Sequence, residues 1–570
     1  MLYLKYNMLK IISMIMFFFG ILFLFLSMVF KFMSMNLILE WSIIKIMAMD
    51  IKIILMIDFY SLFFSFIVMY ISSSIILFSE YYMEGIKMMN RFIILMLLFV
   101  MSMIMLIYSS NMIFLLLGWD GLGLVSFLLV IFYQNKSSLS GGMLTILSNR
   151  LGDGFLILGL CMMYDVMSYN YIYMTYFDNK YMYFMFLILL ACMTKSAQFP
   201  FSAWLPAAMA APTPVSSLVH SSTLVTAGVY LLIRYSDCLK FMNFNTILLY
   251  MCLVTMVMAG LSAMYENDLK KIVALSTLSQ LSLMMLAVSL GMYDMAYFHL
   301  ITHATFKSLM FLCVGVLMHG YSGYQDMRFM SLKLNKSNFL SILMIYTFMT
   351  LGGMFFLSGF YSKDLIIEFI FMHNYSIFIM IMLYIGSMLT IMYSVRVIYM
   401  IYTNSLCFNS LSMSLSSNLL LLPLLMLFFL SLISGNLMSW LLFDSPTHII
   451  LNFFSKIFIL LLIIVSLIIM YPLMKLFLAI HIKNSIFSSF LGSMWFVNNF
   501  SSEHIIYLSL SYSMHINKFI DKGWSENMGG LGMYTKLTNL SKFSNNYYYY
   551  NMSMYLMMFV FWIMIILFIV

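Results

Sequence analysis

The chain has 570 residues, of which 64% are hydrophobic and only 8% are charged, and its mean hydropathy is +1.02. These values exclude a soluble globular protein, because an ordinary soluble domain has about 25% charged residues. The net charge of +8 comes from Lys and Arg scattered along connecting segments, so it does not indicate binding to nucleic acid.

Apolar runs of roughly 20 residues predict an all-α, polytopic membrane protein with about 15 transmembrane helices. No polar mature region follows a cleavable signal, so the first run is expected to be a retained span. The N-terminal helices occupy residues 1–110, the C-terminal ones 404–480, and a final anchor 551–570. The spans are expected near residues 9–30, 54–79, 91–109, 111–133, 142–163, 183–205, 214–234, 245–265, 268–291, 294–319, 338–369, 376–403, 417–436, 452–480 and 552–570.

The distribution of positive charge predicts the orientation of the chain. With an odd number of spans, the N-terminus and every second connection share one side, and that side holds most of the Lys and Arg. By the positive-inside rule, it faces the matrix or cytoplasm. The 64 Met residues suit an AT-rich genome in which a second codon is read as Met, as in animal mitochondria. The sequence therefore predicts a multi-pass membrane protein that is surrounded by lipids and encoded by such a genome.

Two of the spans are expected to be broken. Two prolines closely follow Lys195 and cannot continue its helix. Glycines precede Lys363 in the second case. Broken helices at matching places are typical of inverted repeats with an ion site near the middle of the membrane. We expect two such halves of five helices each, at residues 111–234 and 245–403.

The segment 481–550 is mixed polar and holds no run apolar enough to span the membrane. It is expected to form a lateral amphipathic helix along the membrane surface or along partner subunits. Gly529, Gly530 and Gly532 should interrupt or bend it. A disordered loop around 544–551 is the alternative for its end.

Three ionisable residues occupy one face of the span near 294–319. His299, His303 and Lys307 follow one another at four-residue spacing, which stacks them over about 12 Å of helix. Each ionisable group at membrane depth costs about 2.5–3.5 kcal/mol on the mildest scale. Histidine exchanges protons near neutrality. The triplet therefore indicates a pathway that carries protons inside the membrane.

Other ionisable residues within spans are Asp120, Lys195, His220 and Lys363, with Asp364 beside the last. Burial disfavours the charged form of lysine, and a nearby carboxylate restores it. Movement of Asp120 toward or away from Lys195 would therefore switch whether the lysine holds its proton.

Structural roles are the alternatives for these residues. Asp120 and Lys195 would then form a static pair, and His220 would link helices by hydrogen bonds beside Ser-Ser-Thr. Lys363 and Asp364 would be a snorkelling pair at a helix end.

Two pairs of charged residues invite simpler interpretations. Arg150 and Asp153 are expected to form an intrahelical ion pair rather than a proton step. Glu266 and Asp268 are expected to be solvated in a short loop.

The sequence gives little support for a metal or cofactor site in this chain. His299 and His303 would suit a metal, but their span has no carboxylate or thiolate and Lys307 repels cations. The six cysteines form no CxxC motif and no cluster, which argues against an iron–sulfur or structural zinc site. No phosphate loop or dinucleotide fingerprint is present.

Several motifs together resemble those of the antiporter-like subunits of respiratory complex I, in order over about residues 55–403. They are Gly118-Trp-Asp-Gly-Leu-Gly, Asn149-Arg-Leu-Gly-Asp153, Lys195-Ser-Ala-Gln-Phe-Pro-Phe, Ala211-Pro-Thr-Pro-Val-Ser-Ser-Leu-Val-His220, Asn267-Asp-Leu-Lys-Lys-Ile-Val-Ala-Leu-Ser-Thr-Leu-Ser-Gln280, His299 to Lys307 and Gly359-Phe-Tyr-Ser-Lys-Asp364.

The resemblance implies proton translocation across the inner membrane, driven by electron transfer from NADH to ubiquinone in other subunits. FMN, iron–sulfur clusters and ubiquinone are then expected in or at those subunits, and no cofactor in this chain. The implied partners are other membrane-arm subunits, especially neighbouring antiporter-like subunits that the lateral helix contacts. The implied proton relay consists of Asp120, Lys195, His220, His299, His303, Lys307, Lys363 and Asp364.

Three departures from the family pattern stand out. Asp120 occupies a position where relatives commonly have Glu, and Phe355 one usually held by Pro. One apolar span precedes residue 50, where many relatives have two. Two other functions are alternatives: a cation/proton antiporter subunit, and a structural membrane subunit without its own proton channel.

Overall fold

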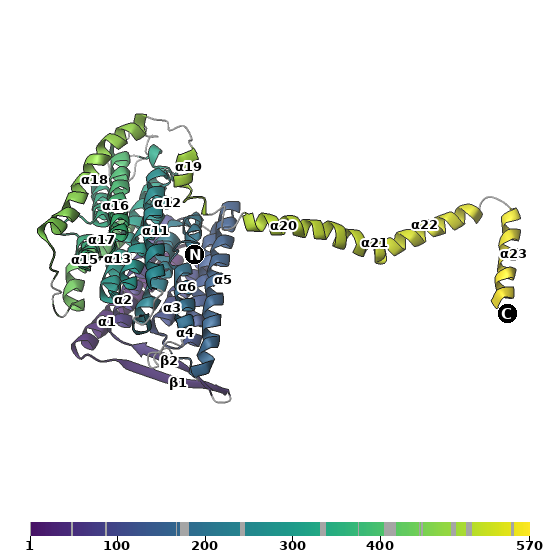
Figure 1. Ribbon diagram of the computed structural model, residues 1–570, viewed down its shortest axis with the longest axis horizontal. Coiled ribbons are helices and arrows are strands. Elements are labelled where there is room, and N and C mark those ends of the chain that lie inside the picture. Colours follow the sequence, from purple (N-terminus) through teal and green to yellow (C-terminus); the bar gives the residue numbers. More distant parts are fainter. Residues whose placement is uncertain are drawn as a thin grey trace. The chain divides into compact units, whose positions relative to one another are not determined.

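The computed structural model describes residues 2–46, 49–85, 88–166, 168–170, 182–239, 245–330, 338–373, 375–403, 418–443, 445, 449–479, 486–497, 504–548 and 552–569. The chain divides into two compact units, residues 1–497 and 498–570. The first is a bundle of long helices packed side by side (Figure 1).

The long helices of the first unit are α1 (Leu2–Phe32), α2 (Phe59–Tyr82), α3 (Met89–Tyr108), α4 (Met112–Val130), α5 (Lys136–Met162), α6 (Met182–Lys195), α9 (Leu224–Arg234), α11 (Asn245–Tyr265), α12 (Leu269–Ser289), α13 (Tyr293–Gly320), α14 (Asn338–Gly352), α16 (Ile377–Thr403), α17 (Asn418–Leu442) and α18 (Phe453–Ala479). Short helices complete it: η1 (Ile131–Tyr133), η2 (Met163–Val166), η4 (Phe201–Ala203), α7 (Trp204–Ala207), η5 (Ala208–Ala210), α8 (Thr213–Val215), η6 (Ser216–Thr223), α10 (Ser236–Leu239), η7 (Met327–Phe329), η8 (Phe360–Asp364), α15 (Leu365–Met372) and α19 (Ile486–Gly492).

The prediction of an all-α membrane protein is confirmed. Within the described residues, 12 helices are long and apolar enough to cross a membrane. Four further apolar helices are shorter, at Met182–Lys195, Phe201–Ala210, Phe339–Gly352 and Leu461–Met470. Three of these lie in the expected spans 183–205 and 338–369, which the structure divides into pieces. The expected count of about 15 stays a prediction.

The predicted halves are unequal in these bounds. Residues 111–234 hold four spans when α6 and the short helices after it are counted as one broken span, whereas 245–403 holds five. Including α3 in the first half would restore five. The boundaries of the halves stay a prediction.

A β-hairpin between α1 and α2 is a feature that the sequence did not predict. Strands β1 (Leu37–Ile46) and β2 (Met49–Ile57) pair antiparallel. The expected second span began near 54, but α2 begins at Phe59, because the Asp58 carboxylate accepts from the Ser61 N–H and caps the helix. Short apolar runs do not distinguish a strand from a helix.

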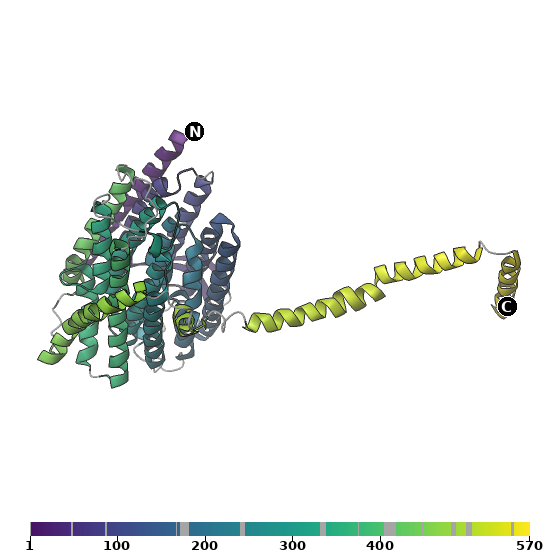
Figure 2. The same cartoon turned by 90° about the horizontal axis from the view of Figure 1, so that it is seen from above.

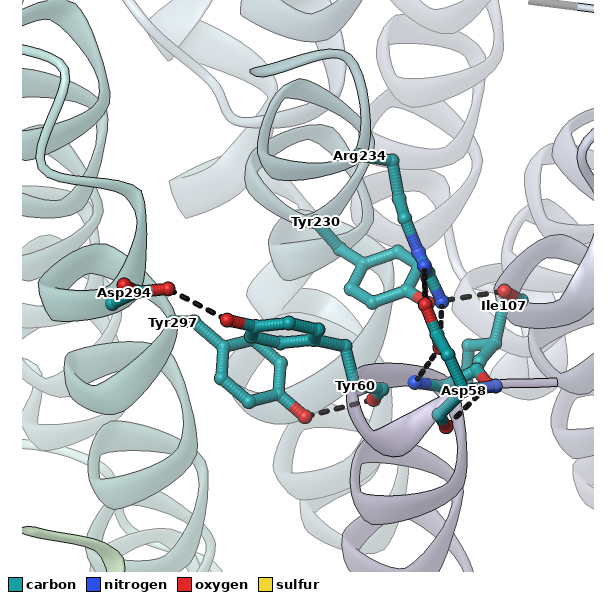
Figure 3. A network of polar contacts seen from close by, with 8 residues as sticks. Asp58, Tyr60, Ile107, Tyr230, Arg234, Asp294 and Tyr297 are labelled. Atoms are coloured by element: carbon teal, nitrogen blue, oxygen red, sulfur yellow. Dashed lines mark hydrogen bonds and ion pairs between the residues drawn. The ribbon is translucent and has the colours of Figure 1, made fainter. Parts of the chain in front are cut away.

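Asp58 also forms a buried ion pair that joins distant helices (Figure 3). Arg234, the last residue of α9, donates to both of its carboxylate oxygens, one of them at 2.8 Å. The Arg234 Nε donates to the Tyr230 hydroxyl at 2.8 Å, which donates to the Ile107 carbonyl of α3 at 3.0 Å. The start of α2 is thereby tied to the ends of α9 and α3.

The same end of α2 is also tied to α13, the helix of the His–His–Lys triplet. The Tyr60 hydroxyl donates to Asp294 Oδ1 at 2.6 Å, and the Tyr297 hydroxyl donates to the Tyr60 carbonyl at 2.8 Å (Figure 3). Two hydrogen bonds on the N-terminal side of the triplet therefore hold the register of α13 relative to α2.

The second unit contains α20 (His504–Ile516), η10 (Asn517–Ser525), α21 (Glu526–Met528), α22 (Gly530–Tyr548) and α23 (Met552–Ile569). The first four follow one another along a line (Figure 2). The predicted interruption lies at Gly529, whose backbone is extended between α21 and α22, whereas Gly530 and Gly532 lie within α22. The alternative of a disordered loop is wrong for 544–548, which is helical, and 549–551 lies outside the described residues.

Glycines make the break after α14 possible. Gly353 has φ of +80°, a left-handed conformation that other residues rarely adopt. A Cβ on Gly359 would lie 1.8 Å from the Thr350 carbonyl oxygen. The chain can therefore pass this close to the end of α14 only where a glycine stands.

Substitution of Gly359 by Ala is expected to lower the stability of the protein by about 1–3 kcal/mol, because the backbone has to move to make room. The measurement is the thermal midpoint of the purified assembly that contains the chain. Gly154→Ala in α5 is the matched control, because a Cβ there meets no heavy atom within 4 Å. Equal midpoints for both variants would contradict the close approach.

Replacement of Asp58 by Asn is expected to cost about 3–5 kcal/mol of stability, because it leaves a buried guanidinium without its carboxylate. Thermal unfolding of the assembly measures the loss. Glu40→Gln breaks the exposed pair of Glu40 with Lys52 on the hairpin, where the distance is 3.1 Å. This control substitution should lower the stability by only about 0–1 kcal/mol.

The pH dependence of the Asp58 contribution follows from its pKa. Burial raises this pKa most strongly as a single cause, but the charge and hydrogen bonding of Arg234 and the hydrogen bonds of Ser61 together hold the pKa below its ordinary value of 3.8. The pair therefore stabilises fully above about pH 4, and its contribution is lost as the pH falls through the lower folded-state pKa. Stability that does not decline more steeply in wild type than in Asp58→Asn below pH 4 would contradict this assignment.

Candidate functional site

The first broken helix places a lysine inside the bundle. Helix α6 ends at Lys195, as the two prolines predicted, and the Lys195 side chain is fully buried. Its Nζ donates to the Trp119 carbonyl at 3.1 Å and lies 4.8 Å from the centroid of the Trp119 ring. A Cβ on Gly123 would lie 3.7 Å from this Nζ, so the glycine leaves room for the ammonium group.

Asp120 does not contact Lys195 in this structure. Within the described part of the chain, no carboxylate oxygen lies within 4.0 Å of the Lys195 Nζ. Asp120 is 39% exposed, and its carboxylate lies 3.5 Å from Arg150 on α5. Successive residues of a helix differ by about 100° in direction, so α4 turns Trp119 toward Lys195 and Asp120 away from it.

A second carboxylate, Asp153 of α5, also acts on the lysine. The predicted intrahelical pair is confirmed, with Arg150 and Asp153 3.1 Å apart. Asp153 is buried, its Oδ1 has no hydrogen-bond partner among the described residues, and its charge acts on Lys195 more strongly than that of Asp120 does. Arg150 therefore pairs both with Asp120 and with a buried carboxylate whose charge acts on Lys195.

His220 lies in a π-helical segment, η6, between α8 and α9. The side chain is buried, and neither ring nitrogen has a hydrogen-bond partner among the described residues. The hydroxyls of Ser222 and Thr223 donate to the Leu218 carbonyl of their own segment at 3.0 and 2.6 Å. The alternative that His220 links helices by hydrogen bonds is therefore wrong.

Lys270 is a buried cation that the sequence analysis did not single out. It lies in the first turn of α12, and its Nζ donates to the Ala211 carbonyl and, at 3.2 Å, to the Met209 carbonyl. Its charge acts on His220. The sequence held no signal that separated Lys270 from Lys271, because apolar residues stand three and four positions after each of the two lysines.

The triplet on α13 is buried, as expected, but its members have different partners. The Lys307 Nζ donates to the Ser276 hydroxyl of α12. The His303 ring nitrogens have no hydrogen-bond partner among the described residues, and its ring centroid lies 6.2 Å from that of His299. The structure therefore places three proton-exchanging groups along the contact between α12 and α13.

His299 is held from two sides. Its Nε2 lies 3.1 Å from the Gln280 Oε1 of α12, and its Nδ1 lies 2.9 Å from the Ser362 hydroxyl of η8. This contact joins the triplet to the second broken helix.

The second broken helix also carries a buried lysine. Helix α14 ends at Gly352, and the chain resumes as the π-helix η8, which includes Lys363 and Asp364. The Lys363 Nζ donates to the Thr390 hydroxyl of α16 at 2.7 Å. Because Lys363 is only 3% exposed, the alternative of a snorkelling pair is wrong. Asp364 is buried, and its Oδ2 has no partner among the described residues.

The loop before α12 is more ordered than expected. Asp268 forms an ion pair with Lys271 at 2.9 Å. Arg396 of α16 donates to the Glu266 carbonyl and to the Asn267 side chain, both at 2.9 Å. The prediction that Asp268 is only solvated is therefore wrong, because it pairs with Lys271, whereas for the Glu266 carboxylate it stays a prediction.

The arrangement can move protons but holds no group of metal ligands in the part of the chain that is described. Among those residues, no three His, Cys, Asp or Glu side chains could hold a metal ion together. The ionisable residues instead form a series of separate buried groups. They lie on α6, η6, α12, α13 and η8, at Lys195, His220, Lys270, His299, His303, Lys307, Lys363 and Asp364.

Two family models match the chain. The model described as "NADH:quinone oxidoreductase/Mrp antiporter, TM" matches residues 109–390. The model described as "NADH dehydrogenase subunit 5 C-terminus" matches residues 393–570.

Curated relatives match over most of the chain. It is 44% identical over 533 residues to NADH-ubiquinone oxidoreductase chain 5 of Locusta migratoria, covering 92% of this chain and 93% of that protein. It is 44% identical over 554 residues to the chain 5 protein of Anopheles gambiae, covering 95% of each. The chain 5 protein of Lumbricus terrestris is 41% identical over 526 residues, covering 90% of this chain and 89% of its own.

Solved structures share the fold at low sequence identity. A chain of the Mrp complex from Dietzia sp. DQ12-45-1b matches with a TM-score of 0.72 and 22% identity, over 95% of this chain and 63% of that one. A chain of the membrane-bound sulfane sulfur reductase, an archaeal respiratory membrane complex, matches with a TM-score of 0.64 and 19% identity, over 77% of this chain and 94% of that one.

Proposed function

The chain belongs to the family of NADH-ubiquinone oxidoreductase chain 5 proteins, and from this premise we propose that it carries protons across the mitochondrial inner membrane. In this proposal it is a membrane subunit of the NADH:ubiquinone oxidoreductase, and electron transfer in other subunits drives the movement. FMN, iron–sulfur clusters and ubiquinone would lie in or at those subunits, with no cofactor in this chain.

One observation carries the proposal: the buried ionisable residues lie at the breaks in the helices and along the helices between them. Lys195 and Lys363 each stand at a break, and the α13 triplet lies between them in the fold. Each charge at membrane depth costs about 2.5–3.5 kcal/mol even on the mildest scale. Such residues persist where they serve a pathway, because an apolar side chain would stabilise the bundle better.

The proposed relay runs through all eight residues that the family resemblance implied, with Lys270 and Asp153 added. Lys195 exchanges its proton under the influence of Asp153, and Asp120 acts on that carboxylate through Arg150. His220 and Lys270 connect the first half to the α13 triplet. Water molecules have to bridge the gaps between the members of the relay, because several of the imidazole nitrogens have no protein partner among the described residues.

The second unit is the proposed contact with partner subunits. Its helices expose many large apolar side chains, among them Phe519 and Trp524. Such a surface suits neighbouring antiporter-like subunits and the membrane interface better than water.

A cation/proton antiporter subunit is the second candidate, and the fold shared with the Mrp complex chain favours it. The two functions differ in what drives the transport. Proteoliposomes that acidify only when NADH is oxidised support the respiratory subunit, whereas NADH-independent exchange of sodium for protons supports the antiporter.

Replacement of Lys363 by Met in the intact oxidoreductase is expected to lower NADH-driven proton transport about tenfold, because a proton-exchanging group at the second break is lost. A tenfold loss corresponds to about 1.4 kcal/mol in the barrier. Proton uptake by proteoliposomes is measured together with NADH oxidation. Lys271→Met, at an exposed ion pair, is the matched control and should transport normally. Normal transport by an assembled Lys363→Met enzyme would instead support a purely structural subunit.

Asp153→Asn is expected to impair proton transport more than Asp120→Asn does, by several fold. Asp153 is buried and its charge acts on Lys195 more strongly than that of Asp120, whose side chain is 39% exposed and paired with Arg150. The same proteoliposome assay, corrected for the amount of assembled enzyme, compares the two. The reverse order would mean that Asp120 leaves Arg150 and pairs directly with Lys195 during transport.

A further inference from the structure

Ser362 is the residue that connects the α13 triplet to the second broken helix. Its hydroxyl lies 2.9 Å from the His299 Nδ1 and accepts from the Thr302 hydroxyl at 3.1 Å. The hydroxyl also lies 3.4 Å from the Ser358 carbonyl oxygen, to which it can donate. The side chain is fully buried, and Lys363 follows it in η8.

Gln280 determines which nitrogen of His299 carries the hydrogen in the neutral ring. The Gln280 Oε1 lies 3.1 Å from the His299 Nε2, and an amide oxygen can only accept a hydrogen bond. The hydrogen of the neutral imidazole is therefore on Nε2. The Nδ1 is left as an acceptor, and it receives the hydrogen bond of the Ser362 hydroxyl.

Protonation of His299 has to reverse that hydrogen bond. A proton can be added only at Nδ1, and the resulting N–H then donates to the Ser362 oxygen. The Ser362 hydroxyl has one hydrogen and two acceptor positions. Its hydrogen must leave His299, and the Ser358 carbonyl is the acceptor within reach. The oxygen meanwhile accepts from both Thr302 and His299, so every partner stays satisfied in both states.

We propose that Ser362 is a positioning residue whose hydroxyl turns between His299 and the Ser358 carbonyl as His299 gains and loses a proton. Gln280 is its counterpart, which confines proton exchange to the nitrogen that faces η8. The inference rests on the proposed proton relay and specifies one of its steps. In that step the Ser362 hydrogen passes to Nδ1 while the Ser362 oxygen takes a proton from a water molecule of the relay, and the new hydroxyl hydrogen points to the Ser358 carbonyl. On release, Nδ1 returns a hydrogen to the Ser362 oxygen, and the other hydrogen leaves to water.

Other groups that face His299 bear on its protonation. His303 lies one turn along α13, and the Lys363 charge acts on His299 from η8. From α16, the Tyr393 hydroxyl lies 3.2 Å from the Ser279 hydroxyl, next to Gln280. A pH profile therefore reports this whole cluster, and the role of Ser362 has to be read from the difference between matched variants.

The test uses the intact oxidoreductase in proteoliposomes, with NADH-driven proton transport measured from about pH 6 to 9. Ser362→Ala is expected to lower transport about tenfold and to move the pH of half-maximal transport. Ser362→Thr keeps the hydroxyl and should recover most of the rate and the wild-type profile. Ser282→Ala is the control: it removes a buried hydroxyl of α12 that donates to the Ser279 carbonyl of its own helix at 2.6 Å, and it should change neither quantity.

Three outcomes would overturn the inference. They are normal transport by Ser362→Ala, a lowered rate with an unmoved pH profile, and no recovery by Ser362→Thr. Where Ser362→Ala does not assemble, Gln280→Met decides instead, because loss of the amide oxygen should also move the profile. Lys363→Met separates this inference from the proposed function: if that variant fails and Ser362→Ala works, only the role of Ser362 is wrong. If both transport normally, the relay itself is wrong.

Discussion

In a hydrocarbon environment, each polar group of the backbone needs a partner within the protein, and this constraint governs how the bundle can be broken. A helix that ends at membrane depth exposes carbonyls that water would otherwise bind. Here buried side chains meet them. The Trp204 indole donates to the Thr194 carbonyl at 3.0 Å, at the end of α6, and Lys270 donates to the carbonyls of Met209 and Ala211. Lys270 thus stabilises backbone that lies outside a regular α-helix.

The same requirement explains the many hydroxyls on the helices. Those of Ser276, Thr302 and Thr390 each donate to a carbonyl of their own helix, at 2.7, 3.2 and 2.7 Å. Their oxygens remain able to accept from Lys307 or Lys363, or their hydrogens to turn toward Ser362. A hydroxyl with a backbone acceptor in reach can therefore change partner without leaving a buried group unsatisfied.

The two broken helices each hold a buried lysine, but the carboxylates near the two lysines come from different places in the chain. At the second break, Asp364 follows Lys363 directly in a π-helical turn, so the carboxylate and the amine move together. At the first break, the carboxylates belong to α4 and α5, and Arg150 stands between Asp120 and Asp153. Relative motion of helices can alter the charge around Lys195, whereas Lys363 keeps its carboxylate. The first half is therefore the better suited of the two to a conformational switch.

The sequence alone determined the class of the protein, the breaks at Lys195 and Gly352, and the identity of most of the buried ionisable residues. Apolar runs of membrane length, helix-breaking residues and costly charges are local signals that need no knowledge of neighbouring helices. The partners of those residues were decided by tertiary structure. Trp119 in place of Asp120 beside Lys195, the buried position of Lys270, the β-hairpin and the contact of His299 with Ser362 all depend on how helices far apart in the sequence are rotated against one another. A rotation of one residue, about 100°, changes which side chain faces the interior, and only the packing of the complete bundle sets it.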